Sequence, residues 1–389
     1  MRVAIASRIF EPEPSAASFR LGALANELLN AGHEVTVLTV RPPTEFASLT
    51  QDEARPYRVK RAPVLRDRTG YVRGYLPYLS FDLPLFFRVL FKRNVDVFVV
   101  EPPPTTGFFV RVAAWLRNVP YAYYAADVWS DATRLTGASA VVVSAVSIVE
   151  RWALNGARLV FATSPEVKLR LGEIGVRTEV VTVGNGVDVS AFAFDEAPTA
   201  PEEPLFIYGG TAAEWHGAEV FVHAMEIVQR RYPSARLKFV GGGSQRDELA
   251  ALAGSLKLEN TEFLAPMPPE QFGELLALAT ASLASVRPGT PYEFAFPTKL
   301  YGSTVAGVPL IFAGAGPAVE YVRTEVAGSP LGQVCSFSAD EVADAMMRTI
   351  EFPRDGKRRE RVSYWGRDNV GLEGVAQKIR KELERTVRR

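Results

Sequence analysis

The chain contains two successive series of short apolar, β-branched segments that are separated by stretches of helical spacing. The first series includes residues 3–6, 35–40 and 97–100, and the second begins at residues 205–208. Short apolar strands that alternate with helices are typical of a parallel sheet covered by helices. The pattern therefore predicts an α/β protein with two doubly wound, Rossmann-like domains and a ligand cleft at the carboxyl ends of their strands.

An acidic, proline-rich stretch at residues 194–204 separates the two series and is typical of a linker. We therefore predict an N-terminal domain over residues 1–190, a linker over 191–204 and a second domain over 205–370. A last helix is expected near residues 372–387, where Val375, Ile379 and Leu383 recur at helical spacing.

The composition argues against several classes of protein. Lys and Arg number 44 and are balanced by 44 Asp and Glu, so no nucleic-acid partner is expected. A single cysteine, Cys335, leaves no internal disulfide framework and fits a cytoplasmic location. The three histidines and this cysteine show no metal-ligand spacing, so neither a metal nor a bound cofactor is expected.

No secretory signal or membrane-spanning segment is expected, because the longest uncharged run, residues 300–319, is interrupted by glycine and proline. Residues 81–93 mix aromatic side chains with Arg88, Lys92 and Arg93. Such a segment fits peripheral contact with the inner face of a membrane, or a helix packed on its sheet with its cations exposed. Both interpretations remain open.

The most specific motif lies at residues 291–309, where Glu293 precedes Pro297, Thr298 and Lys299 and a small-residue helix follows. A helix N-terminus offers backbone N–H groups and a positive dipole end to phosphate. A lysine in a first turn is unfavourable for the dipole, which favours a phosphate contact for Lys299 over a merely solvated position. A nearby carboxylate can accept hydrogen bonds from sugar hydroxyls. These residue types suit a nucleotide sugar.

Other candidate residues follow predicted strands. The glycine-rich loops at 209–211 and 241–243 either bring backbone N–H groups to a diphosphate or simply turn tightly. His216 would contribute a partial charge at neutral pH. Asp127 either orients an acceptor hydroxyl or caps the helix that follows it.

The motif at 291–309, together with residues 12–20, 127–131 and 183–188, resembles the retaining family 4 glycosyltransferases of the GT-B fold. The resemblance covers nearly the whole chain and is closest to bacterial enzymes that build cell-envelope polysaccharide. It implies two Rossmann-like domains facing a central cleft, with residues 371–389 packed back on the N-terminal domain. This chain departs from the family pattern at Gly302, where a ribose-binding Glu is usual, and at Ala126, where a basic residue is usual.

The resemblance implies a metal-independent, hexosyltransferase-type glycosyltransferase (EC 2.4). It would move a sugar, with retention, from a nucleotide-sugar donor to a hydroxyl of a cell-envelope or polyprenyl-linked glycan. Asp127 and Glu293 would be the catalytic residues. The acceptor-side loop would use Ser15, Ala16, Ala17 and Arg20. The residues implied to bind the donor are Gly209, Gly210, Thr211, His216, Gly242, Gly243, Pro266, Met267, Phe296, Thr298, Lys299 and Leu300.

Three rival functions are considered. A catalytically degenerate GT-B protein that acts as a partner subunit or binding module is favoured by Gly302 and Ala126. A GT-B sugar-nucleotide epimerase would need several catalytic histidines, in which this sequence is poor. A nicotinamide dehydrogenase would need a G-x-G-x-x-G turn after the first strand, and that turn is absent.

Overall fold

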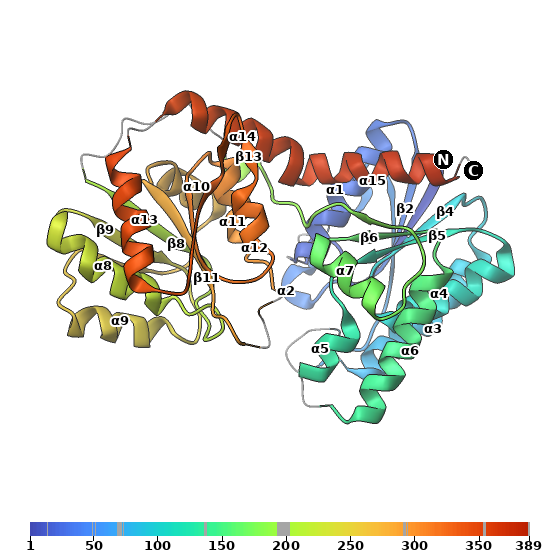
Figure 1. Ribbon diagram of the computed structural model, residues 1–389. Helices are drawn as coiled ribbons and strands as arrows, with labels where there is room; N and C mark the ends of the chain where they lie inside the picture. Colours follow the sequence, from blue (N-terminus) through green and yellow to red (C-terminus); the bar gives the residue numbers. More distant parts are fainter. Residues whose placement is uncertain are drawn as a thin grey trace. The chain divides into compact units, whose positions relative to one another are not determined.

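The protein is described from a computed structural model that covers residues 1–13, 15–48, 50, 52–67, 72, 74–135, 138–192, 203–290, 293, 295–352 and 355–387. The chain divides into two compact units (Figure 1). Unit 1 comprises Met1–Gly186 and Leu372–Arg389, and unit 2 comprises Val187–Gly371. Most of the predicted linker, residues 193–202, lies outside the described residues.

Unit 1 contains a seven-stranded parallel sheet of order β3-β2-β1-β4-β5-β6-β7. Its order reverses between β1 and β4, which is the switch point of a doubly wound sheet. The strands are β1 (Arg2–Ala6), β2 (Glu34–Val40), β3 (Arg58–Ala62), β4 (Val97–Val100), β5 (Tyr121–Ala125), β6 (Leu159–Ala162) and β7 (Val180–Thr182).

Helices cover both faces of this sheet because most of its strands are apolar on both sides. One face packs on α1 (Ala16–Asn30) and α15 (Leu372–Val387). The other packs on α3 (Tyr75–Phe91), α4 (Pro104–Arg117) and α6 (Ala140–Gly156). The shorter helices are α2 (Thr44–Ala47), α5 (Trp129–Leu135) and α7 (Pro165–Glu173).

Helix α15 lies against α1 and returns the end of the chain to unit 1. Its side chains Val375, Ile379 and Leu383 are buried among residues of β1, β2 and α1. The apolar stripe that recurs along this helix therefore completes one half of the unit 1 core.

Unit 2 contains a six-stranded parallel sheet of order β10-β9-β8-β11-β12-β15, which reverses between β8 and β11. The strands are β8 (Leu205–Gly209), β9 (Arg236–Val240), β10 (Thr261–Leu264), β11 (Ala281–Val286), β12 (Leu310–Gly314) and β15 (Gly332–Cys335). A small antiparallel pair joins β13 (Glu325–Val326) to β14 (Ser329–Pro330). The prediction of two doubly wound α/β sheets is confirmed.

The helices of unit 2 also lie on both faces of its sheet. Helices α8 (Glu219–Arg231) and α13 (Ala339–Glu351) contribute to one core cluster. The remaining helices are α9 (Arg246–Ser255), α10 (Pro269–Ala277), α11 (Lys299–Val305), α12 (Ala318–Arg323) and α14 (Gly356–Val370). Within the described ranges, no helix is both long enough and apolar enough to cross a bilayer, and no three His, Cys, Asp or Glu side chains are grouped to hold a metal.

Candidate functional site

A cavity of about 590 Å³ lies in unit 2 beside the loops that follow strands β8, β9 and β10. Its walls are largely aromatic and aliphatic, with Phe192, Trp215 and Phe272 among residues that the sequence did not single out. The predicted donor residues that line it are Gly209, Gly210, Thr211, His216, Pro266, Met267, Phe296, Thr298 and Lys299. One cavity thus gathers residues that lie up to 115 positions apart in the chain, from Val187 to Gly302.

Three predicted donor residues do not line this cavity. Gly242 lines a small adjacent cavity, and Gly243 lines neither. The Leu300 side chain is fully buried in the core, and its backbone N–H already donates to the carbonyl of Pro297. Leu300 therefore contributes to the packing of α11 rather than to the cavity wall.

Lys299 is the first residue of α11, and its ammonium lies in an unusual environment. The Nζ atom is 3.4 Å from the centroid of the Tyr208 ring, is buried, and has no hydrogen-bond partner within the described structure. Burial lowers the pKa of this ammonium well below its ordinary value. An anion bound in the cavity would supply the missing partner and favour the charged form.

His216 is 6% exposed and stacks on Trp215, with ring centroids 3.6 Å apart. Its Nδ1 accepts a hydrogen bond of 3.2 Å from the N–H of Ala213. Burial, and secondly the charge of Lys299, lower the pKa of His216 to about 4. The expected partial charge is therefore absent at neutral pH, because a cation at this position would be both desolvated and repelled.

The glycines of the loops after β8 and β9 allow the two backbones to touch. A Cβ on Gly241, at a φ of +140°, would lie 2.3 Å from the carbonyl oxygen of Gly210. A Cβ on Gly243, at a φ of +127°, would lie 2.1 Å from the carbonyl oxygen of Ala212. This contact favours tight packing as the reason for these two glycines.

Gly302 lines the cavity, and the Phe192 ring fills the space where a side chain at position 302 would begin. A Cβ there would lie 3.0 Å from the edge of that ring. The neighbouring Ser303 is buried, and its hydroxyl lies 2.7 Å from the Ser282 hydroxyl. Glu293 is not among the lining residues, and its Oε2 accepts a hydrogen bond from the Gly289 N–H.

A second cavity, of about 300 Å³, lies in unit 1 at the carboxyl ends of β1, β4 and β5. All of the predicted acceptor-side residues, Ser15, Ala16, Ala17 and Arg20, line it, and so does Asp127. Sequence reasoning missed Arg8 and Glu101, which also line it. Glu101 directly follows a buried strand, and that position was a usable signal.

Arg20 organises the inner wall of this second cavity. Its guanidinium pairs with Glu101 at 2.8 Å, donates to the Oδ1 of Asn185 at 2.5 Å and lies over the Tyr124 ring. Arg20 and Glu101 are both buried, so the pair is largely neutral toward the cavity. Arg20 therefore positions the loop around it, whereas Asp127 remains available in the cavity.

Asp127 does not cap helix α5. The backbone N–H groups of Trp129 and Ser130 donate to the two carboxylate oxygens of Glu150, at 2.6 and 2.9 Å. Glu150 belongs to α6 and is 2% exposed. The capping interpretation is therefore wrong for Asp127. The Asp127 side chain is exposed to solvent, but the protein around its carboxyl still raises the pKa of that group through desolvation. The charge of Arg20 opposes this rise.

Comparison with known families agrees with this geometry. Residues 16–186 match the glycosyl transferase 4-like domain, and residues 190–369 match the glycosyl transferases group 1 family. The two matches together cover most of the chain. The chain therefore belongs to the family 4 glycosyltransferases and is a glycosyltransferase that uses a nucleotide sugar.

Solved structures of the GT-B fold match nearly the whole chain. The Anabaena protein Alr3699/HepE in complex with UDP has a TM-score of 0.69 at 17% identity, covering 99% of this chain and 100% of that one. A glycosyltransferase from Rickettsia africae has a TM-score of 0.69 at 15% identity, covering 99% and 98%. A search of curated proteins found no match. The predicted GT-B fold is confirmed.

Proposed function

We propose that this enzyme transfers a hexose, with retention, from a nucleoside diphosphate sugar to a hydroxyl of a cell-envelope or lipid-linked glycan. The observation that carries the proposal is the buried Lys299 ammonium, which has no hydrogen-bond partner within the described structure. An apolar cavity with one such cation suits a ligand that presents both a planar base and a diphosphate. The similar Anabaena structures contain UDP and UDP-glucose, so these are the ligands to test first.

The proposed reaction needs neither a metal nor a bound cofactor. The acceptor hydroxyl attacks the anomeric carbon while the bond from that carbon to the diphosphate oxygen breaks. The hydroxyl proton passes to a donor phosphate oxygen, and Lys299 stabilises the negative charge of the departing diphosphate. Asp127 orients the acceptor hydroxyl. We assign a hydroxyl of the donor sugar to Glu293, although its carboxylate is bonded to the Gly289 N–H and lies outside the lining of the unit 2 cavity.

Calorimetric titration of the full chain with UDP and UDP-glucose tests the donor site. Lys299→Ala should weaken binding by about 1–3 kcal/mol, which is typical of a lost charged hydrogen bond. Lys357→Ala, at an exposed position of α14, is the matched control and should bind as the parent does. Unchanged affinity in the Lys299 variant would remove this lysine from the site.

We also propose that α3 contacts an anionic membrane surface. One face of this helix is buried through Phe81, Leu85 and Val89. The opposite face exposes a stripe of large apolar side chains, Leu76, Leu79, Leu83, Phe87 and Phe91, the last 73% exposed. The Arg88 guanidinium donates to the backbone carbonyls of Thr39 and Lys60, so it braces the helix instead of extending into solvent.

The packing of Phe81 on the sheet agrees with the second interpretation of residues 81–93, whereas Arg88, which that interpretation left exposed, is bonded to backbone carbonyls. The membrane contact of the opposite face stays a proposal. Co-sedimentation with phosphatidylglycerol vesicles tests the proposal. Phe87→Ser/Phe91→Ser should bind these vesicles less, because the apolar contact area is reduced. Tyr364→Ser, a large exposed side chain of unit 2, serves as the control. Equal sedimentation of all three proteins would overturn the membrane contact.

A further inference from the structure

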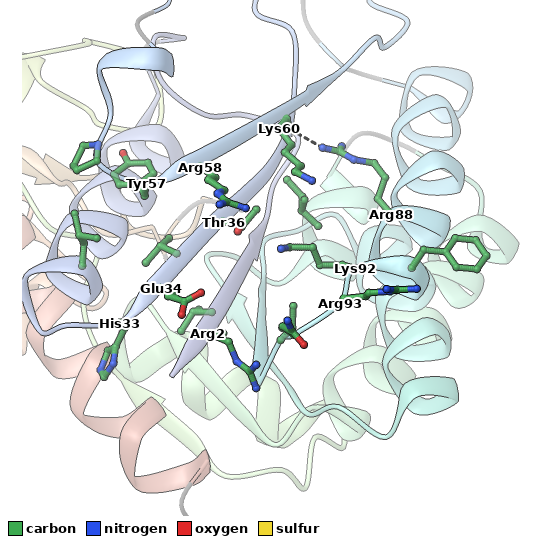
Figure 2. A pocket seen from close by; sticks show the side chains of 18 residues that line it. Arg2, His33, Glu34, Thr36, Tyr57, Arg58, Lys60, Arg88, Lys92 and Arg93 are labelled. Atoms are coloured by element: carbon green, nitrogen blue, oxygen red, sulfur yellow. Dashed lines mark hydrogen bonds between the residues drawn. The ribbon is translucent and has the colours of Figure 1, made fainter.

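A further cavity, of about 710 Å³, lies in unit 1 and plays no part in the proposed reaction. Figure 2 shows basic side chains from two strands and from the end of a helix gathered around it. We name it the cationic pocket, after its lining residues Arg2, Arg58, Lys60, Arg88, Lys92 and Arg93.

The fold explains why these cations share one place. Arg58 and Lys60 are two residues apart on β3, so both side chains leave the same face of the sheet. Thr36 of β2 is in register with Arg58 and lines the same pocket. Helix α3 covers this face further along the strands and ends at Phe91, and Lys92 and Arg93 follow it. The amino ends of the strands therefore stay open, with cations on two sides (Figure 2).

The positive charge of the pocket is not neutralised within the described structure. Arg2 pairs with Asp96 at 2.6 Å, and Arg88 is bonded to backbone carbonyls. The other four cations have no ion pair among the described contacts, and Glu34 is the one acidic residue in the described lining. Burial, followed by the charges of Lys60 and Arg58, lowers the pKa of Lys92. The cations therefore repel one another when nothing is bound.

We propose that the cationic pocket is a second binding site, for an anion that carries at least two phosphate groups. Arg58 and Arg93 offer planar guanidinium forks that match phosphate oxygens, and Lys60 and Lys92 add mobile point charges. The volume exceeds what a single phosphate fills, and four unpaired cations exceed what it neutralises.

The cationic pocket lies far from the acceptor-side cavity of the same unit. Arg2 begins β1, whereas Ser7, which lines the acceptor-side cavity, follows the end of that strand. A strand of this length spans about 17 Å. A ligand in the cationic pocket therefore binds without occupying the acceptor-side cavity.

Two kinds of ligand present two or more phosphate groups to the pocket: a free oligophosphate, and the headgroups of an anionic lipid surface. Phe91 lines the pocket and stacks on Phe87, with ring centroids 6.4 Å apart at an interplanar angle of 11°. The pocket thus continues into the exposed apolar stripe of α3. The phosphate contacts are the same in either case, and the experiment separates the two sources.

The test uses the full chain and Lys60→Glu/Lys92→Glu, in which two of the unpaired cations are reversed. Pyrophosphate is titrated by calorimetry with Lys299→Ala present in every protein compared, which weakens the proposed diphosphate site of unit 2 and leaves the cationic pocket empty for the probe. Co-sedimentation with phosphatidylglycerol vesicles is measured in parallel. Binding to at least one of these two probes should weaken about tenfold or more, because several charged hydrogen bonds are lost. Arg158→Glu/Lys168→Glu carries the same charge change at exposed positions of unit 1 outside the pocket and should bind normally.

The outcomes are distinguishable. Loss of pyrophosphate binding assigns the pocket to free oligophosphates, and loss of vesicle binding alone assigns it to lipid headgroups. If the pocket variant and the control variant lose binding of a probe equally, the attraction is diffuse and the inference is overturned. The inference is also overturned if the parent protein binds neither pyrophosphate nor vesicles. Without ligand, the pocket variant should melt no lower than the parent, because the substitution relieves repulsion. Failure of UDP to bind would overturn the proposed donor site, and the comparison of pocket and control variants would still decide the cationic pocket.

Discussion

At the scale of single residues, burial of His216 makes unit 2 sensitive to acid. Its pKa falls from an ordinary 6.5 to about 4 on folding, so the unfolded chain takes up the proton first as the pH drops. Stability should therefore be lost between about pH 6.5 and pH 4, by up to about 3 kcal/mol. In urea unfolding measured from pH 7 to pH 4, the free energy of unfolding of His216→Asn should depend less on pH than that of the parent protein. His223→Asn, at an exposed position of α8, should leave this pH dependence unchanged. An unaltered slope in the His216 variant would show that this group does not drive the loss.

At position 302, the neighbouring Phe192 ring limits which side chains fit. A glutamate there would add charge-assisted hydrogen bonds to ribose hydroxyls, but the Phe192 ring occupies the space that its side chain would need. Gly302→Glu alone should therefore not tighten UDP binding and should lower the melting temperature. Gly302→Glu/Phe192→Ala should bind UDP about tenfold more tightly than Phe192→Ala alone. Tighter binding by the single Gly302 variant would mean that the ring moves aside easily.

At the scale of secondary-structure elements, α5 depends on a carboxylate from a different helix. Glu150→Ala should destabilise the protein by about 1–3 kcal/mol, because two backbone N–H groups at the start of α5 lose their buried acceptor. Asp127→Asn should leave thermal stability nearly unchanged and lower the transfer rate. If Asp127→Asn destabilises the protein as much as Glu150→Ala does, Asp127 has a structural role after all.

The elements themselves were predictable where apolar spacing is regular. The last helix was expected at residues 372–387, and its stripe of Val375, Ile379 and Leu383 is buried. Contacts that join distant parts of the chain left no local pattern. Glu150 lies about twenty positions from the N–H groups it accepts, Glu101 lies 81 from Arg20, and Phe192 reaches Gly302 through the fold alone. Most of the residues named as donor-binding could thus be placed in one cavity of unit 2, whereas the distant partners of α5, Arg20 and Gly302 could not be predicted.

At the scale of the whole molecule, the stability of unit 1 depends on residues from both ends of the sequence. Ile379 is fully buried against β1, β2 and α1. Ile379→Ala should cost about 2–4 kcal/mol, as large-to-small substitutions in a core do. In this variant, backbone amides of β1 and β2 should exchange faster, whereas those of β8 and β9 should not, because unit 2 has its own core. Lys381→Ala, on the exposed side of the same helix, should change neither the stability of the protein nor the exchange rates of these strands. Equal loosening of both sheets would mean that the two units unfold together.

The return of α15 to unit 1 also determines the order in which the protein can be completed on the ribosome. Residues 187–371 form a unit of their own between two parts of the other. The second unit can therefore close its core while the first, although synthesised earlier, still exposes the apolar surface that α15 will cover. A nascent chain that stalls before residue 372 leaves that surface open, and a chaperone that binds apolar segments would find its target at the beginning of the protein rather than at its growing end.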